Sequence, residues 1–244
     1  MIDLHTHILP GIDDGARDWD EALAMLRLAA EDGITTVVAT PHAHHSQGVD
    51  VRAAVADLND LASAASIPVR ILAGSEVRIA SGLIERHRTG QLHTINDSRY
   101  LLLELPLHDD WPEPHLFRVV DELLAEGVVP ILAHAERYRF VERDPHRLLP
   151  LIERGVPVQV NARSLLYREA DPDRRSADHL IALGYVHLLA SDAHNAGYRA
   201  PQLRPAYERA ATLAGVTWVT SAQAMAAAIV KDNVIAITVP PRVR

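Results

Sequence analysis

The chain has 244 residues, of which 48% are hydrophobic and 23% charged, a composition that excludes disordered, collagen-like and coiled-coil proteins. Its formal net charge of −8 at pH 7 argues against nonspecific binding to nucleic acids, which depends on neutralising phosphates. Cysteine is absent and Lys231 is the only lysine, so disulfides, thiolate metal sites and cysteine nucleophiles are excluded, and Schiff-base or P-loop chemistry is disfavoured.

Short apolar runs, each followed by a polar turn and a helical pattern, recur about every 30 residues, which is typical of βα units. They predict seven strands, at residues 2–5, 35–40, 69–76, 100–105, 129–134, 156–161 and 186–191. Amphipathic patterns predict helices at residues 22–30, 50–65, 115–126, 145–154, 175–183 and 201–214, and a helical stretch near 221–230. Asp18 and Glu21 resemble a capping box for the first helix, and Gly33 is placed to end it.

Apolar strands joined by helices indicate a parallel sheet that is buried on both faces. Seven or eight βα units over this length favour an α/β fold closed into a barrel, as a single domain of residues 1–244, with a doubly wound open sheet as the alternative. No leader-like segment and no bilayer-length apolar run is visible, so we expect a cytoplasmic protein without membrane insertion. The apolar first helix could form the contact of a homo-oligomer.

Six of the seven predicted strands end in a histidine or a carboxylate. Side chains alternate along an extended chain, so His5 and His7 point the same way, as do Asp192 and His194. A barrel gathers the carboxyl ends of its strands on one rim, where we expect a common pocket. The nine candidate metal ligands are His5, His7, Asp14, His42, Glu76, Glu104, His134, Asp192 and His194.

Imidazoles and carboxylates without sulfur suit Zn²⁺, Mn²⁺ or Fe²⁺. Nine ligands are too many for one ion and suit about three ions if one carboxylate bridges two of them. Such ions would leave surplus positive charge for a phosphate and would lower the pKa of a bound water. Arg137 and Arg199 lie close to these motifs, and guanidinium groups match phosphate oxygens in bidentate fashion.

The opening residues 1–15, which contain Asp13-Asp14-Gly15, strongly resemble the PHP superfamily (polymerase and histidinol phosphatase domain). More narrowly, they resemble the manganese-dependent bacterial protein-tyrosine phosphatases of capsular and exopolysaccharide synthesis loci, the CpsB/CapC-like group. Further motifs follow in family order up to about residue 201. They are Ala39-Thr40-Pro41-His42, Gly74-Ser75-Glu76-Val77, Leu102-Leu103-Glu104-Leu105-Pro106, Ala133-His134-Ala135-Glu136-Arg137-Tyr138 and Ser191-Asp192-Ala193-His194-Asn195.

The resemblance implies a distorted (β/α)₇ TIM-like barrel, the PHP fold, with three divalent ions, Mn²⁺ first and Fe or Zn²⁺ as alternatives. Arg137 and Arg199 would bind the phosphate, and a metal-bound water or hydroxide would attack phosphorus directly, without a phosphoenzyme. The implied substrate is phosphotyrosine on the tail of a bacterial tyrosine autokinase that controls capsule or exopolysaccharide synthesis. The implied ligand sets are His5, His7, Glu76 and Asp192; Glu76, Glu104 and His134; and Asp14, His42 and His194.

Two other functions remain open on the sequence. A small-molecule phosphoesterase, such as a histidinol phosphatase, would use the same kind of site. A noncatalytic PHP-type module is the second alternative, although such a module would be expected to have lost some ligands, and all nine positions are filled here.

Overall fold

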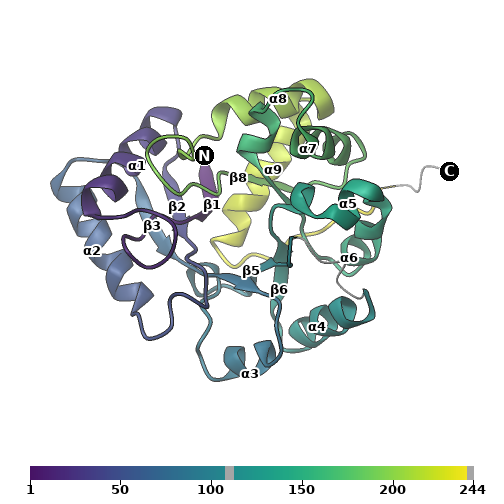
Figure 1. The fold of residues 1–244 in the computed structure, drawn as a ribbon, viewed down its shortest axis with the longest axis horizontal. Coiled ribbons are helices and arrows are strands. Elements are labelled where there is room, and N and C mark those ends of the chain that lie inside the picture. Colours follow the sequence, from purple (N-terminus) through teal and green to yellow (C-terminus); the bar gives the residue numbers. More distant parts are fainter. Residues whose placement is uncertain (108–112, 241–244) are drawn as a thin grey trace.

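The computed structural model describes residues 1–107 and 113–240, and Figure 1 shows the strands near the centre with helices around them. The strands are β1 (Ile2–Thr6), β2 (Thr36–Ala39), β3 (Arg70–Ala73), β4 (Glu76–Arg78), β5 (Tyr100–Glu104), β6 (Val129–Leu132), β7 (Gln159–Asn161) and β8 (Leu188–Ala190). The α-helices are α1 (Trp19–Asp32), α2 (Val51–Ala64), α3 (Leu83–Arg88), α4 (Glu113–Ala125), α5 (Arg139–Arg143), α6 (Leu149–Glu153), α7 (Pro172–Ala182), α8 (Arg204–Ala214) and α9 (Val216–Ile229). Four short 3₁₀ helices complete the described elements: η1 (Ile95–Asp97), η2 (Ala135–Arg137), η3 (Pro145–Leu148) and η4 (Ala162–Leu166).

The described strands pair in parallel and form three short sheets, with the orders β1-β2-β3, β4-β5-β6 and β7-β8. This confirms the predicted α/β class with parallel strands. Neighbours in each sheet follow in sequence order, without the reversal of a doubly wound sheet, so that alternative was wrong. Isolated parallel bridges link the sheets, and these join Thr6 to Ala193, His42 to Glu76 and Leu132 to Val158.

The third predicted strand is two strands, so the prediction of seven strands was wrong. The break falls at Gly74, between β3, which pairs with β2, and β4, which pairs with β5. A Cβ atom added to Gly74 would lie 2.9 Å from Cγ1 of Val38 and 3.2 Å from Cγ2 of Thr40. The chain passes so close to β2 here that a side chain would not fit, and the pairing partner changes directly afterwards.

The predicted cap and stop of α1 are confirmed, but the helix, Trp19–Asp32, is longer than the predicted range 22–30. Asp18 accepts a hydrogen bond from the backbone N–H of Glu21 at 2.8 Å, and Gly33 ends the helix with a φ of 86°. The other half of the expected capping box was wrong. The carboxylate of Glu21 accepts from the backbone and the Nε of Arg17 instead.

The other helices differ from their predicted ranges mainly where prolines or short turns intervene. The predicted helix at 145–154 is divided into η3 and α6, each with a proline in its first two positions. Helix α7 begins earlier than predicted, at Pro172, because Asp171 caps it. The stretch near 221–230 belongs to α9, which begins at Val216, and the short helices α3 and α5 were not predicted.

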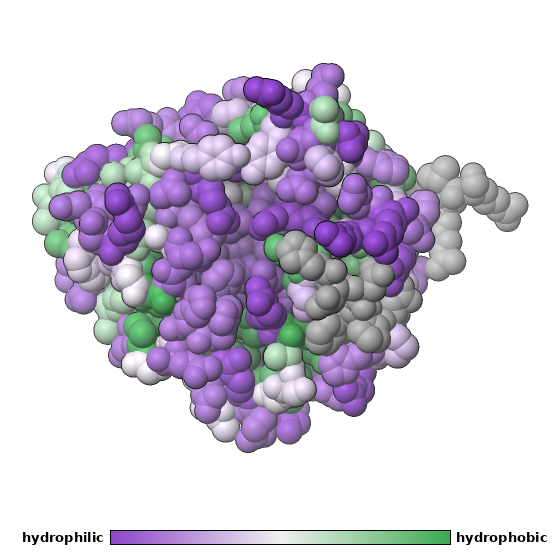
Figure 2. Space-filling model, in the orientation of Figure 1, coloured by the Kyte–Doolittle hydropathy of each residue, from purple (hydrophilic) through white to green (hydrophobic). Residues whose placement is uncertain are grey.

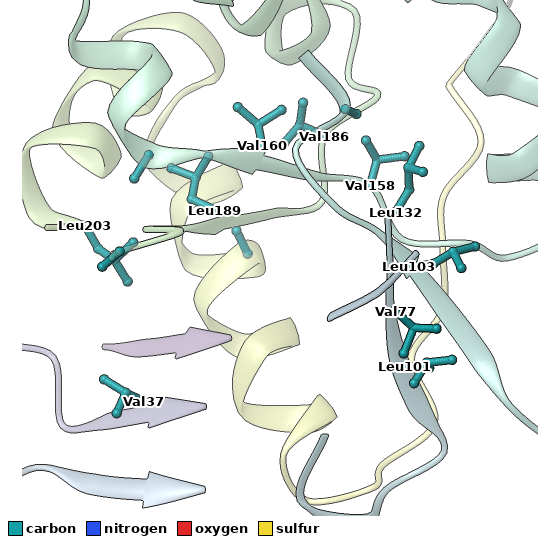
Figure 3. Packing of buried hydrophobic residues seen from close by; sticks show 14 of the residues in the cluster. Val37, Val77, Leu101, Leu103, Leu132, Val158, Val160, Val186, Leu189 and Leu203 are labelled. Carbon is teal, nitrogen blue, oxygen red and sulfur yellow. The ribbon is translucent and has the colours of Figure 1, made fainter. Parts of the chain in front are cut away.

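Two layers of apolar side chains surround the strands. Val37, Leu101, Leu103 and Leu132 belong to the large outer cluster, and Figure 3 shows these four side chains on their strands. The inner cluster joins six strands to α9, and its members include Leu4, Val38, Leu72, Leu102, Ile131, Leu188, Ala226 and Ile229. Burial of the inner cluster therefore ties α9 to all three sheets.

The surface drawn in Figure 2 is hydrophilic in its hollowed middle, with apolar residues mostly around that area. None of the helices in the described ranges is long and apolar enough to span a lipid bilayer.

Candidate metal centre

All nine predicted ligands meet in one polar cluster close to the carboxyl ends of β1, β2, β5, β6 and β8. Seven of the nine are buried, whereas His42 is half-buried and Asp14 is exposed. The fold therefore brings together residues as far apart in the sequence as His5 and His194, 189 positions.

Glu76 lies at the middle of the cluster. It is the first residue of β4 and not the last residue of a strand, as predicted, and its bridge to His42 places it beside the end of β2. Its Oε1 lies 2.9 Å from Nε2 of His134 and 3.5 Å from Nε2 of His5. Its Oε2 lies 2.9 Å from Nδ1 of His42 and 3.4 Å from Nε2 of His7. One carboxylate thus reaches four imidazoles, which suits a bridging ligand.

A first group of potential ligands consists of His5, His7 and Asp192. The two Nε2 atoms are 3.2 Å apart, and Oδ1 of Asp192 lies 3.4 Å from Nε2 of His5 and 3.5 Å from Nε2 of His7. The ring pair thus converges on one point with the carboxylate, as the alternation of side chains along the first strand predicted.

A second group contains His7, Asp14, His42 and His194, whose ligand atoms all lie within 4.8 Å of one another. Oδ1 of Asp14 lies 3.3 Å from Nε2 of His194 and 3.6 Å from Nε2 of His42. The set inferred from the resemblance, Asp14, His42 and His194, is therefore together, and His7 borders both this group and the first.

A third group contains His42, Glu76 and Glu104. The resemblance implied His134 instead of His42 here. Nε2 of His134 lies 2.9 Å from Oε1 of Glu76 and 3.8 Å from Oε1 of Glu104, so His134 also faces both carboxylates.

In three of the histidines, a hydrogen bond at Nδ1 orients the ring so that Nε2 faces the cluster. Nδ1 of His7 contacts Oδ2 of Asp13 at 2.7 Å, and Nδ1 of His194 contacts the carbonyl oxygen of Asp192 at 2.9 Å. Nδ1 of His5 contacts Oε1 of Gln159, an oxygen that also accepts the backbone N–H of His134. Because these partners are acceptors, each Nδ1 carries a proton, and each Nε2 faces the cluster, where a bound cation can take the place of its proton. This donor set fits divalent cations.

Most of the cluster favours positive charge, whereas burial and the nearby His7 lower the pKa of His194 to about 4. Burial lowers the pKa of His7, but hydrogen bonds to Asp13 and Glu76 outweigh it and raise the pKa to about 10. Burial raises the pKa of Glu76, but the nearby His5 and the hydrogen-bonded His134 and His42 hold it well below its usual value. The carboxylates thus stay ionised, and their field attracts protons or cations.

Two of the nine residues have a left-handed backbone, with a φ of 31° at His134 and 53° at Asp192. Non-glycine residues in this region carry a strain of about 1–3 kcal/mol, which persists only where the surroundings hold them. Both residues stand two positions after the last residue of a strand, β6 or β8, and both side chains face the cluster.

The predicted arginines lie at the edge of the same cluster. Nη2 of Arg199 donates to Oδ2 of Asp192 at 2.9 Å, and Nη1 of Arg137 lies 3.7 Å from the same oxygen. Both guanidinium groups line a cavity of about 170 Å³ with Asp14, His42, Glu104, His134 and His194. A third arginine, Arg78, also lines this cavity and donates from Nε to Oε2 of Glu104 at 3.0 Å.

Sequence reasoning missed several residues that hold the ligands in place. Asp13 was noted only as part of a motif, and Arg78 was overlooked although it lies two residues after Glu76. Asn161 donates to Oδ2 of Asp192 at 2.7 Å, and Nε2 of Gln159 donates to Asn161 at 2.9 Å. One signal was available for Asn161. It ends the one predicted strand that has neither a histidine nor a carboxylate at its end, and strand ends line the site.

Comparisons with known proteins connect this site to a family. A family model described as capsular polysaccharide synthesis, CpsB/CapC, matches residues 1–229. The tyrosine-protein phosphatase YwqE of Bacillus subtilis (strain 168) is 35% identical over 201 residues, which cover 80% of this chain and 78% of YwqE. The putative tyrosine-protein phosphatase CapC of Staphylococcus aureus is 34% identical over 200 residues, with coverages of 80% and 77%.

A solved structure is also closely similar. It comes from work on YwqE from Bacillus subtilis and CpsB from Streptococcus pneumoniae, described as unique metal-dependent tyrosine phosphatases. Its TM-score is 0.92 at 32% sequence identity, with 100% of both chains covered. The resemblance found in the sequence is thereby confirmed.

Proposed function

The chain belongs to the CpsB/CapC family of capsular polysaccharide synthesis proteins, and we propose that it is a metal-dependent tyrosine-protein phosphatase acting at the cluster described above. One observation carries this proposal. Nine histidine and carboxylate side chains from distant segments converge beside Arg137 and Arg199, next to an open cavity.

We propose that the cluster holds three divalent ions, Mn²⁺ in the first place, with Fe or Zn²⁺ as alternatives, because three groups of its side chains could each hold one. When bound, divalent ions supply Lewis-acid chemistry that polarises phosphate oxygens and makes water a stronger nucleophile. We assign His5, His7, Glu76 and Asp192 to one ion, Glu76, Glu104 and His134 to a second, and Asp14, His42 and His194 to a third. Asp13 and Gln159 support this assignment, because they hold the Nδ1 protons of His7 and His5.

Arg137 and Arg199 are assigned to binding the substrate phosphate. A guanidinium group has five N–H donors, so the contact of Arg199 with Asp192 leaves others free for phosphate oxygens. Asp192 faces both arginines, and its carboxylate holds the Arg199 guanidinium at the cavity wall. Both groups stay charged at any working pH, which favours binding of a dianionic phosphate.

The substrate class follows from the relatives, which are named tyrosine-protein phosphatases. We propose that the partner is the phosphotyrosine-bearing tail of a bacterial tyrosine autokinase and that the reaction regulates capsule or exopolysaccharide synthesis. We further propose that the three sheets form the distorted barrel of the PHP fold, because the isolated bridges link them in a closed cycle.

The test is to compare hydrolysis of a phosphotyrosyl peptide with hydrolysis of histidinol phosphate by the metal-loaded protein. We expect a higher kcat/KM for the peptide, loss of this activity after chelation and its return after Mn²⁺ is added. A large preference for histidinol phosphate would contradict the tyrosine-phosphatase assignment, and activity that survives complete chelation would contradict the role of metal.

A further inference from the structure

A second cavity, of about 160 Å³, adjoins the metal centre. It shares Arg137, Asp192 and Arg199 with the first cavity, and its remaining wall comes from η4, from the start of α7 and from the loop after β8. Arg163, Tyr167 and Tyr198 line this cavity but not the first one. We call the second cavity the Arg163 pocket. A group bound there would lie next to a phosphate held by Arg137 and Arg199.

Arg163 is poised to bind an anion. Its Cζ atom lies 3.2 Å from the centre of the Tyr198 ring and 5.5 Å from the centre of the Tyr167 ring. Within residues 1–107 and 113–240, no carboxylate forms an ion pair with it. Its side chain is hydrogen-bonded to Tyr167, and its Nε is buried without a hydrogen-bond partner. An arginine that is partly withdrawn from water and not paired with a carboxylate favours a ligand that supplies negative charge.

The charges of the pocket agree with this. Three guanidinium groups line it, from Arg137, Arg163 and Arg199, against the carboxylates of Asp173 and Asp192. Asp192 already accepts hydrogen bonds from Arg199 and Asn161. Even with both carboxylates ionised, the three guanidinium groups leave one positive charge in excess. The pocket therefore keeps a surplus of positive charge.

The loop after β8 holds the aromatic wall of the pocket in position. The side-chain oxygen of Asn195 accepts the backbone N–H groups of Gly197 and Arg199, at 3.0 and 2.9 Å. The backbone N–H of His194 donates to the carbonyl oxygen of Arg199 at 2.9 Å. These bonds hold the loop that carries Tyr198 between His194 and Arg199. Tyr198 is 74% exposed, and its ring covers Arg163.

We propose that Arg163, with Tyr167 and Tyr198, forms a specificity subsite for a second anionic group of the substrate peptide, a carboxylate or a second phosphate close in sequence to the scissile phosphotyrosine. This inference rests on the proposed function, because it takes the first cavity as the site of the scissile phosphate. Charge-assisted hydrogen bonds of about 1.5–3 kcal/mol would favour such substrates about 10-fold to 100-fold.

The experiment compares three phosphotyrosyl peptides of one sequence: one with neutral neighbours, one with aspartates beside the phosphotyrosine, and one with a second phosphotyrosine. The quantity measured is the ratio of kcat/KM for each anionic peptide to that for the neutral peptide. We expect a ratio of at least about 10 in the wild type for one or both anionic peptides, and the larger ratio identifies the preferred anion.

In Arg163→Gln the ratio should fall toward 1, and in Arg163→Lys it should remain intermediate because the charge is kept. Tyr198→Ala changes an exposed ring and should also lower the ratio, which guards against a folding defect in the Arg163 variants. Arg27→Gln, at an exposed position of α1, is the matched control and should keep the wild-type ratio.

A wild-type ratio near 1, or a ratio that Arg163→Gln leaves unchanged, would overturn the subsite while leaving the phosphatase assignment intact. Equal losses on neutral and anionic peptides would also overturn it, because they would indicate a general defect of the site. Failure of the metal-loaded wild type to hydrolyse any of the peptides would overturn both proposals.

Discussion

The same strands build two regions with opposite physical character. Toward α9, Leu4, Leu102 and Leu188 belong to the inner apolar cluster, whose burial stabilises the fold. One to four residues further along each strand, His5, Glu104 and Asp192 enter the polar cluster, where buried charge and strained backbone act against stability. Burial at the apolar end thus offsets the unfavourable free energy of the polar end. Changes in the polar region should therefore lower activity more than stability, and changes in the apolar region should lower stability more than activity.

The largest expected effect is on activity, in Asp192→Asn. The amide keeps the shape of the side chain and tolerates the left-handed backbone, but it removes a charge that faces His5, His7 and Arg199. We expect kcat/KM on a phosphotyrosyl peptide to fall at least about 1000-fold, roughly 4 kcal/mol, in steady-state assays with metal present.

The melting temperature of the metal-free Asp192→Asn protein should stay within a few degrees of the wild type. Asp60→Asn, at an exposed position of α2, is the control and should change neither activity nor melting. Near-normal activity in the Asp192 variant would show that the polar region is not the catalytic centre.

The opposite result is expected for Leu102→Ala in the inner apolar cluster, two residues before Glu104. Truncating a fully buried leucine should lower the free energy of unfolding by about 2–5 kcal/mol in urea titrations. Activity per folded molecule should change little, because the side chain belongs to the apolar layer. Leu61→Ala, at a residue that is 38% exposed, should cost far less. Equal losses for the two leucines would contradict the importance of the inner cluster.

A buried histidine just before β8, away from the polar cluster, should make the stability of the fold depend on pH. His187, the residue before β8, accepts the backbone N–H of Val158 through Nδ1, and burial lowers its pKa to about 4. The unfolded chain, with a histidine pKa near 6.5, binds a proton first as the pH falls. His187 therefore contributes stability above pH 6.5 that is lost between about pH 6.5 and 4, by about 3 kcal/mol in all.

In His187→Asn the oxygen can replace the acceptor nitrogen, but nothing titrates in this range. The stability difference between wild type and variant should therefore shift with pH across this window, as measured by urea unfolding at several pH values. A difference that does not vary with pH would show that His187 keeps an ordinary pKa in the folded protein.

The smallest effect is expected for Asp13→Asn, which changes a partner of a ligand. The amide can still accept from Nδ1 of His7, but its charge is lost and its NH₂ group can also turn toward the ring. We expect a 10-fold to 100-fold weaker affinity for Mn²⁺ or a similar loss of activity, measured by metal titration. Rescue of activity by high Mn²⁺ would support a positioning role, whereas an unchanged affinity would contradict it.

In both regions, the sequence could predict what local signals determine and could not predict what depends on contacts between distant segments. The apolar runs and the signals Asp18 and Gly33 act locally, so α1 and most strands could be placed from them. The break at Gly74 could not, because it depends on Val38 in the neighbouring strand. The short helices α3 and α5 lack a side-chain cap, so no local signal marks their start.

In the polar region, residue type alone led to all nine members of the cluster. The partners that orient them, Asp13, Gln159 and Asn161, are common polar residues whose roles depend on contacts across up to 154 positions of sequence. The sequence also placed Glu76 at the end of a strand, although it begins one. Its central position depends on how the sheets meet.

The most direct test of the central claim is an anomalous-scattering map of crystals grown with Mn²⁺. We predict strong peaks within bonding distance of the three groups around His5, Asp14 and Glu104, with Glu76 shared between two of the ions. Manganese bound elsewhere, or absent from these side chains at saturating concentration, would contradict the account.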